Sequence, residues 1–273
     1  MRAPSLPLIA SLLAVLFSVP AFGLAPEEPS AFDADAAIQY SQAAIGRQIG
    51  DYGFLDSGRN EVRLADLQGK PVVVNLVYTA CSYSCPLIVQ TLYSAVEVAQ
   101  DALGADSFAV LTIGFDTEDD TPARMRAYAR SQGVDLPNWR FLSSDETTVA
   151  SLSKDLGFIY FPSPRGFDHL AQTTVIDAEG VVYRHVYGAD FTAPAVVEPL
   201  KDLVFGRQGN FTSVAGLINR VRLFCTFYDP ASERYRFDYA IFIGAAVGSL
   251  SLTAIGIILL RAWLRIRRRE ERA

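Results

Sequence analysis

Two long apolar runs without charge stand near the two ends of the chain. The first, residues 6–22, follows Arg2 and closes on the small residues Ala21 and Gly23, at the spacing that a signal peptidase reads. This pattern predicts a secretory signal over residues 1–23 that is absent from the mature protein. The alternative is an uncleaved anchor helix, but the run is short for a segment that must cross a bilayer.

The second run, residues 239–260, is long enough to cross a hydrocarbon core of about 30 Å at a rise of about 1.5 Å per residue. We expect a transmembrane helix there, with Tyr239 and Trp263 as aromatic residues at its two ends. The tail that follows, residues 261–273, is basic, and positive charge marks the cytoplasmic side of a membrane. The sequence therefore predicts a cytoplasmic C-terminus and an exported domain before the helix.

The apolar residues of the exported part are spaced as in alternating strands and helices. The expected strands are 54–56, 62–64, 72–78, 108–115, 173–176 and 181–187, and the expected helices are 86–102, 121–132, 146–156 and 193–204. Parallel strands joined by crossover helices and followed by an antiparallel hairpin predict an α/β sandwich of the thioredoxin type.

This pattern also divides the chain into segments. After the signal, residues 24–48 are rich in Ala, Pro and Glu at their start and are expected to form a tether. The thioredoxin-like domain is expected over residues 49–209. A membrane-proximal segment over residues 210–238 then leads to the helix over 239–260 and the tail.

Charge and cysteine content narrow the possible functions. Residues 24–238 carry 17 Lys and Arg against 28 Asp and Glu, a net charge of -11, which disfavours nucleic-acid binding and favours basic partners. Three cysteines are too few for a disulfide scaffold, and two histidines exclude a site built from three imidazoles of one chain. A cysteine pair outside the cytoplasm must be a static disulfide, catalytic or metal-bound.

Two cysteines stand where the first long strand is expected to end and a helix to begin. The segment reads Cys81-Ser82-Tyr83-Ser84-Cys85-Pro86. A helix N-terminus stabilises thiolates, so the pair is either a redox dithiol or a thiolate clamp for a soft metal. A static disulfide is the remaining alternative, although so small a ring adds little stability.

A histidine is expected opposite this loop. A dithiol of the thioredoxin kind normally has two residues between its cysteines and a proline before the third core strand, whereas here there are three, and Gln172 precedes that strand. His169 nearby can add a nitrogen to two thiolates, with Asp168 as a partner for its ring. This donor set suits Cu(I) or Cu(II), while zinc would lack a fourth ligand.

The chain resembles the Sco/SenC family of copper-binding assembly proteins. The resemblance rests on four motifs in the family's order, residues 69–74, 78–86, 116–122 and 168–169, and covers residues 40–209. It implies a thioredoxin-like fold, a membrane tether, and copper ligands at Cys81, Cys85 and His169. It also implies copper delivery to, or thiol reduction at, the dinuclear copper site of cytochrome c oxidase.

The order of segments differs from the usual one in this family. The family's usual anchor is N-terminal, whereas this chain resembles a bacterial subset in which a Cys and a Tyr-Asp-Pro motif precede a C-terminal helix. The Cys is Cys225, expected to be a packed thiol between domain and anchor. A third sulfur for a transferring copper and a bridge between two chains are its alternatives.

Three further features each have a structural and a functional interpretation. His185 is expected to be a surface or strand-pairing residue, with a second metal ligand as the alternative. Asp120 or Thr121 is expected to cap the helix near Pro122, while the acidic residues around them steer a basic partner. The aromatic residues before the His169 loop form either an apolar docking surface or part of the core; they are Phe158, Tyr160 and Phe161.

The leading prediction is a copper chaperone in the bacterial inner membrane, with its domain in the periplasm. Its partners would be the copper-site subunit of an oxidase, a periplasmic copper donor or thioredoxin-like reductant, and membrane lipid around the helix, with no nucleic acid. The alternative is an enzyme, a thiol-disulfide reductase with Cys81 as nucleophile and Cys85 as resolving thiol. A peroxide or redox sensor is a third possibility.

Overall fold

The computed structural model describes residues 28–206, 226–229, 234–237 and 239–270. The predicted signal, Cys225 and most of the predicted membrane-proximal segment lie outside these residues. The tail is described as far as Glu270.

A seven-stranded mixed sheet forms the centre of the domain, in the order β2-β1-β5-β4-β3-β8-β9. Its strands are β1 (Gly53–Asp56), β2 (Glu61–Arg63), β3 (Val72–Val77), β4 (Ala109–Gly114), β5 (Trp139–Ser143), β8 (Gln172–Ile176) and β9 (Val182–Tyr187). Strands β3, β4 and β5 are parallel, and β8 and β9 form an antiparallel hairpin beside β3. The expected α/β sandwich of the thioredoxin type is confirmed.

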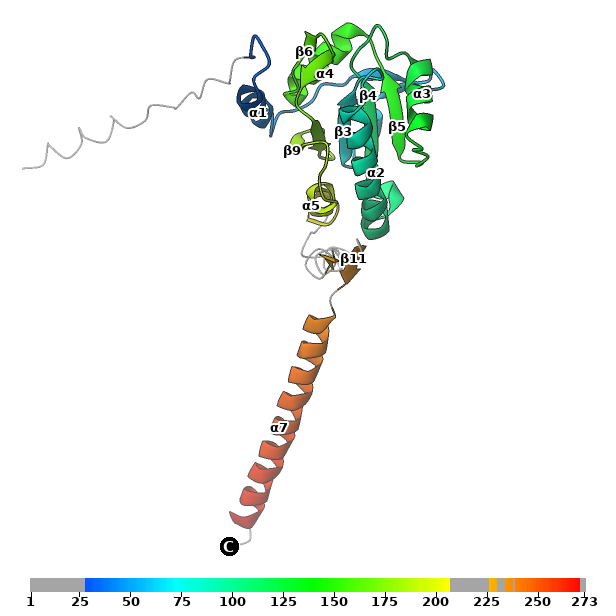
Figure 1. Cartoon of the computed structure of the whole chain (residues 1–273). Helices are drawn as coiled ribbons and strands as arrows, with labels where there is room; N and C mark the ends of the chain where they lie inside the picture. The colour runs from blue at the N-terminus through cyan, green and yellow to red at the C-terminus, as the bar shows by residue number, and fades with distance from the viewer. Residues whose placement is uncertain (1–27, 207–225, 230–233, 238, 271–273) are drawn as a thin grey trace, which may run out of the picture.

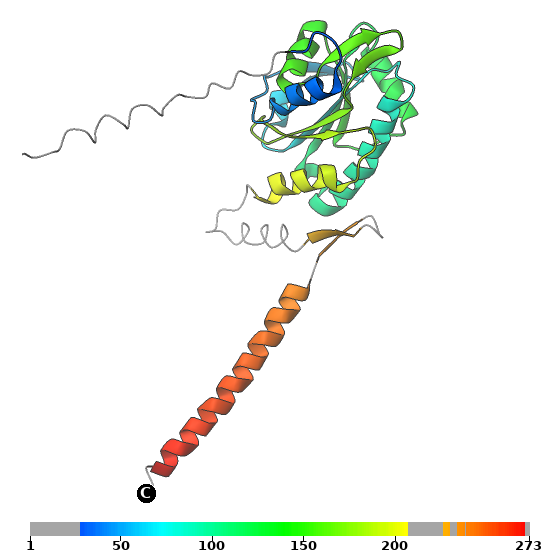
Figure 2. The same cartoon turned by 60° about the vertical axis from the view of Figure 1, so that its left-hand side comes forward.

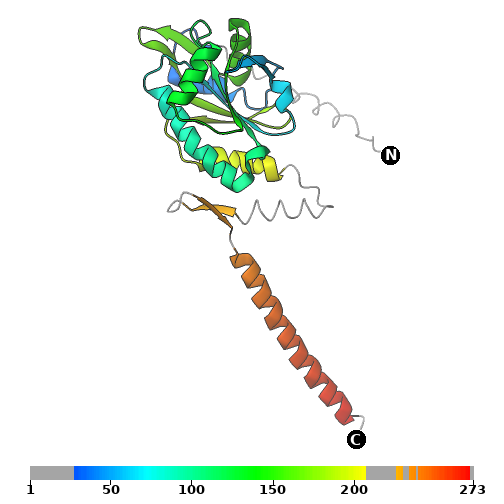
Figure 3. The ribbon, with the colours of Figure 1, turned by 90° about the vertical axis from the view of Figure 1, so that its right-hand side faces the viewer.

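Five helices surround the sheet (Figures 1 and 2). They are α1 (Ala34–Gln42), α2 (Ser84–Leu103), α3 (Pro122–Ser131), α4 (Glu146–Leu156) and α5 (Pro194–Lys201), with the short helical segments η1 (Leu64–Leu67), η2 (Ala105–Ser107) and η3 (Asp202–Gly206). Four of the five match predicted helices to within a few residues. Helix α5 packs against α2, as the view in Figure 3 shows.

The core explains why β3 and β4 are continuous apolar runs. Every residue of both strands is buried, because the sheet is covered on both faces. Helix α2 contributes the fully buried stripe Val89, Leu92 and Val96. Each such side chain stabilises the fold by about 1.5–3 kcal/mol, so this stripe holds α2, and the loop before it, against the sheet.

Three strands of the domain were absent from the sequence prediction. Strand β5 is short and pairs with β4 on one side and β1 on the other, so its partners lie far away in the sequence. The hairpin of β6 (Tyr160–Ser163) and β7 (Gly166–His169) contains Pro162 and Pro164, which favour a loop in a sequence-based assignment. This hairpin is a separate two-stranded sheet.

The segment expected to be a tether contains helix α1 in its second half. Ala37 and Ala44 are fully buried, and Tyr40 is nearly so. At the end of α4, Gly157 adopts a φ of 62°, and a Cβ there would come 2.8 Å from the backbone of Ser41. The chain from Ala34 onwards is therefore packed on the domain rather than free.

His185 is buried, which corrects the expectation of a surface residue but agrees with a pairing role. Its Nδ1 lies 3.0 Å from Thr174 Oγ1 and 3.3 Å from Gln172 Nε2. Burial lowers the pKa of His185 to about 4. The ring is therefore neutral in the fold at neutral pH.

Acid should destabilise the domain through this buried histidine. An unfolded His has a pKa of about 6.5, so the unfolded state binds the proton first as the pH falls, and stability is lost between about pH 6.5 and 4. The maximum loss is about 3 kcal/mol. Urea unfolding of wild type and His185→Gln across this range should show a smaller acid loss in the variant; identical pH dependence would contradict the assignment.

The C-terminal part contains a ribbon and one long helix. The ribbon pairs β10 (Thr226–Asp229) with β11 (Arg234–Phe237), and helix α7 spans Ala240–Glu270. Within the described residues, Phe242–Arg261 is the one helical stretch long and apolar enough to cross a membrane, and none of it is buried in the protein. Figure 1 shows α7 extending away from the domain.

Candidate metal centre

The two cysteines lie in the loop from β3 to α2 and in the first turn of α2. The Cys81 N–H donates to the Tyr78 carbonyl at 3.1 Å, and α2 begins at Ser84, two residues earlier than predicted. Both thiols are free; Cys81 is 8% exposed and Cys85 is fully buried. The Cys85 N–H donates to the Cys81 sulfur at 3.3 Å, and Ser84 Oγ lies 3.2 Å from the same sulfur. The helix start therefore surrounds the Cys81 sulfur with hydrogen-bond donors.

These contacts make the two thiols unequal. A hydrogen bond from the Cys85 thiol is the main cause that lowers the pKa of Cys81, and Ser84 and backbone N–H groups assist against the opposing effect of burial. The same hydrogen bond, together with burial, raises the pKa of Cys85. The two contacts therefore favour the ionised form of Cys81 and the protonated form of Cys85.

Asp120 holds the cysteine loop from the neighbouring strand end. Its carboxylate is 1% exposed and accepts hydrogen bonds from the Thr79 N–H at 2.8 Å and the Asp116 N–H at 3.0 Å. Gly114 leaves room for it, because a Cβ there would lie 2.4 Å from the Asp120 Cβ. The expected cap of α3 is Thr121, whose side chain accepts from the Arg124 N–H, so Asp120 is free to hold the loop.

Removing this carboxylate should destabilise the protein markedly. In Asp120→Ala two partly buried backbone N–H groups lose their acceptor, at about 1–3 kcal/mol each. The matched control is Asp119→Ala, which removes an exposed ion pair with Arg124 and should cost less than about 1 kcal/mol. Denaturant unfolding of both variants measures the difference, and equal losses would show that Asp120 does not hold the loop.

His169 ends β7, on the separate hairpin. Its Nδ1 lies 2.8 Å from the Leu170 carbonyl oxygen, which can only accept, so Nδ1 carries the proton and Nε2 keeps the lone pair that a metal needs. Burial lowers the pKa of His169, which keeps the ring neutral at pH 7. The expected partnership with Asp168 is not what orients the ring, because Nδ1 is bonded to the backbone.

The sulfurs of Cys81 and Cys85 and the imidazole of His169 are not assembled into a metal site in this structure. Within the described residues, no group of three or more His, Cys, Asp and Glu side chains is close enough to hold a metal ion. The His169 ring packs against Tyr78, Phe115 and Phe158, at centroid distances of 6.1, 5.4 and 5.5 Å. A site with all three ligands therefore requires the cysteine loop and the hairpin to approach each other.

The aromatic residues before the His169 loop belong mainly to the core. Phe158 is 2% exposed, and the Tyr160 ring packs against Phe115 in a tilted arrangement with centroids 4.7 Å apart. The sequence interpretation gave no role to Tyr83, which lies between the cysteines and is 79% exposed. The available signal was an aromatic residue in a loop of serines with no predicted packing partner.

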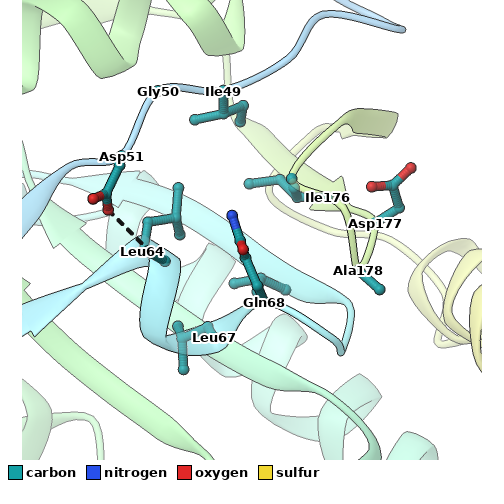
Figure 4. Close-up of a pocket in the computed structure, with 12 residues that line it drawn as sticks. Ile49, Gly50, Asp51, Leu64, Leu67, Gln68, Ile176, Asp177 and Ala178 are labelled. Carbon is teal, nitrogen blue, oxygen red and sulfur yellow. Dashed lines mark hydrogen bonds between the residues drawn. The ribbon is translucent and has the colours of Figure 1, made fainter.

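A small cavity lies at the other end of the sheet (Figure 4). It has a volume of about 110 Å³ and is lined by residues of the β3 start and the β8 end, among them Val72 and Ile176. Asp51 at its rim is held by Arg63 and by the Ala65 N–H. Because Cys81 follows the opposite end of β3, this cavity is not part of the dithiol site.

The fold and the site define a thioredoxin-like protein with an asymmetric dithiol at the N-terminus of its first long core helix and a neutral histidine on an adjacent hairpin. The chain matches the SCO1/SenC family over residues 41–204 and belongs to that family. A search of curated protein sequences finds no match.

Solved structures support the same fold. A putative electron transfer protein from Aquifex aeolicus is 26% identical over 57% of this chain and 92% of its own length, with a TM-score of 0.52. Yeast Sco1 with copper bound is 20% identical over 62% and 97%, with a TM-score of 0.50. BsSco, described as a member of the Sco family of cytochrome c oxidase assembly proteins, is 18% identical over 58% and 94%, with a TM-score of 0.51.

Proposed function

We propose that this protein is a copper chaperone that holds copper through Cys81, Cys85 and His169 and delivers it to the dinuclear copper site of a cytochrome c oxidase. The observation that carries the proposal is the free dithiol at the start of α2, with the Cys85 N–H and Ser84 Oγ within hydrogen-bonding distance of the Cys81 sulfur, in a chain of the SCO1/SenC family. A thiolate is a preferred donor for Cu(I), and copper is here the cargo rather than a resident cofactor.

The residues fit this cargo chemically. Copper binding to both sulfurs requires both thiols to lose their protons, and the Cys85 proton is the harder to remove because its hydrogen bond to Cys81 and its burial raise the Cys85 pKa. The neutral imidazole of His169 offers Nε2 as the third donor. A set of two sulfurs and one nitrogen accepts Cu(I) and tolerates Cu(II), so either form can be carried.

The membrane arrangement is part of the proposal. Residues 1–23 would be the cleaved signal and residues 239–260 the anchor, with the basic tail in the cytoplasm and the domain in the periplasm, as in the bacterial subset with a C-terminal helix. In Figure 1 the start of α2 and the hairpin β6–β7 lie at the end of the domain remote from α7. That placement supports contact with a partner outside the membrane.

The inequality of the two thiols favours a second function, a thiol-disulfide reductase. The Cys81 thiolate would attack a partner disulfide and form a mixed disulfide, and Cys85 would lose its proton, attack the Cys81 sulfur and release the reduced partner. The Cys81–Cys85 disulfide that results needs a thiol reductant, such as a thioredoxin-like protein, before the next cycle.

One experiment separates the two functions. The full-length protein, loaded with Cu(I) in detergent, is mixed with the metal-free copper-site domain of the oxidase subunit, and copper on each protein is measured after separation. Transfer of most of the copper is expected for the chaperone. In parallel, Cys85→Ser is mixed with the same domain in its disulfide form; a trapped covalent complex without copper transfer would support the reductase and refute the chaperone.

A further inference from the structure

A groove lies where strand β5 begins, between helix α3 and the turn that joins β1 to β2. Figure 1 shows α3 beside β5 at the side of the domain. The groove has a volume of about 430 Å³, and its apolar lining includes the buried residues Val62, Trp139 and Phe141. Trp139 is level with the start of β3 across β4, whereas Cys81 follows the end of β3. The groove is therefore at the opposite end of the sheet from the dithiol.

Three arginine side chains line this groove. Arg126 and Arg130 come from α3, and Arg140 comes from β5. All three are exposed, and within the described part of the chain none has a carboxylate at ion-pair distance. Arg124, on the same helix but outside the groove, is paired with Asp119 at 3.3 Å. The groove thus gathers unpaired positive charge in a domain that is acidic as a whole.

Three carboxyl groups also line the groove, but two of them are engaged elsewhere. Asp56 accepts hydrogen bonds from the Asn60 N–H at 2.8 Å and from Asn60 Nδ2 at 3.0 Å. Glu61 lies 3.6 Å from Arg63, which is outside the groove. Only Asp135 remains against the three arginines. Because the planar guanidinium of arginine matches a carboxylate through two parallel hydrogen bonds, the excess charge suits a ligand that carries carboxylates.

Strand β5 has an open edge beside the groove. Strand β1 pairs with β5 only at Leu142 and Ser143, and the chain then turns away over residues 57–60. Residues 139–141 have β4 on one side and, among the described strands, no strand on the other. Since the groove is lined by this turn and by the start of β5, it lies where a longer β1 would run. An open edge of this kind can pair with an added strand.

We infer that this groove docks an extended acidic segment of a partner protein, which adds to the sheet beside residues 139–141. Backbone pairing with β5 and the apolar lining would supply contact, and the arginines would select a segment that carries carboxylates. The site involves neither cysteine and does not rest on the proposed copper function. Each proposal can therefore fail without the other.

The first test measures the choice of charge. The probe is a short fluorescein-labelled peptide of alternating valine and glutamate, added to the full-length protein in detergent at low salt and followed by fluorescence anisotropy. We expect saturable binding that weakens as the ionic strength rises to about 0.15 M, and no binding of the same peptide with lysine in place of glutamate. Absence of binding, or equal binding of the lysine peptide, would overturn the proposal.

The arginines are tested with the same probe. Replacing Arg126 and Arg130 together by alanine should weaken binding about five- to tenfold, because each change removes one exposed charge pair. The matched control is Arg124→Ala, which lies on the same helix outside the groove and should change the affinity by less than about twofold. Equal effects of the double variant and the control would show that the groove is not the docking site.

The second test addresses strand pairing. Two further peptides carry N-methyl groups, one on all its valines and the other on all its glutamates, so every carboxylate is kept. Alternate N–H groups of a strand point to its opposite edges, so only one of the two peptides should lose affinity, by about tenfold. Equal affinity of the two methylated peptides, whether high or low, would overturn the addition of a strand to β5.

Discussion

Replacing either cysteine by serine is expected to reduce Cu(I) affinity by about two to three powers of ten. The estimate follows from zinc sites, where about 10–16 kcal/mol shared among four ligands gives about 2.5–4 kcal/mol per ligand. Serine keeps the size of the side chain but offers a hydroxyl that stays protonated at neutral pH and binds a soft metal poorly. Loss of both sulfurs should leave no copper on the purified full-length protein.

The measurement is a competition titration against a Cu(I) chelator, with copper content determined after gel filtration. Ser84→Ala is the matched control, because it removes a polar group 3.2 Å from the Cys81 sulfur without removing a proposed ligand. Its effect should stay within about tenfold. Retention of copper by the variant lacking both cysteines would rule out the dithiol as the metal site and remove the basis of the chaperone proposal.

Replacing His169 by alanine is expected to weaken Cu(II) binding by about two powers of ten and Cu(I) binding by less. Cu(I) is satisfied by two thiolates, whereas Cu(II) prefers a set that includes imidazole nitrogen. The metal nitrogen would be Nε2, since Nδ1 donates to the Leu170 carbonyl. The loss should appear in the electron paramagnetic resonance spectrum of the Cu(II) form as the disappearance of nitrogen hyperfine splitting.

The chain offers a matched control in its second histidine. His185 is buried beside Thr174, and its replacement by glutamine should leave the copper spectrum unchanged at neutral pH. A wild-type spectrum in His169→Ala would remove this histidine from the site. It would leave the two sulfurs as the whole donor set that the chain supplies.

Most of the fold could be predicted because it depends on local pattern. The continuous apolar runs of β3 and β4 are strands buried on both faces, and the stripe of α2 repeats at helical spacing. Helix α4 begins and ends at the predicted residues, since Asp145 caps its start and Gly157 its end. The elements that escaped prediction include β5 and the β6–β7 hairpin, whose pairing partners or prolines conceal the strand pattern, and helix α1, which lies in the segment expected to be a tether.

The candidate site also has a part that could be predicted from the sequence and a part that could not. Cys81 and Cys85 could be selected from sequence, because a strand end followed by a helix start brings both residues to one loop. Nothing local reveals that Asp120 holds this loop, since its partners Thr79 and Asp116 belong to two neighbouring strand ends. The sequence likewise gave His185 no buried surroundings, because its partners Gln172 and Thr174 lie on the opposite strand of a hairpin.

The sequence by itself determined the class of fold, the apolar C-terminal helix and the thiol pair, since each depends on residues close together in the chain. Only the tertiary structure decided that the pKa values of the two thiols shift in opposite directions, that Asp120 holds the cysteine loop, and that the His169 ring packs on Tyr78. The physical reason is that charge state and ligand separation depend on burial and on hydrogen bonds between distant segments, which no local pattern records.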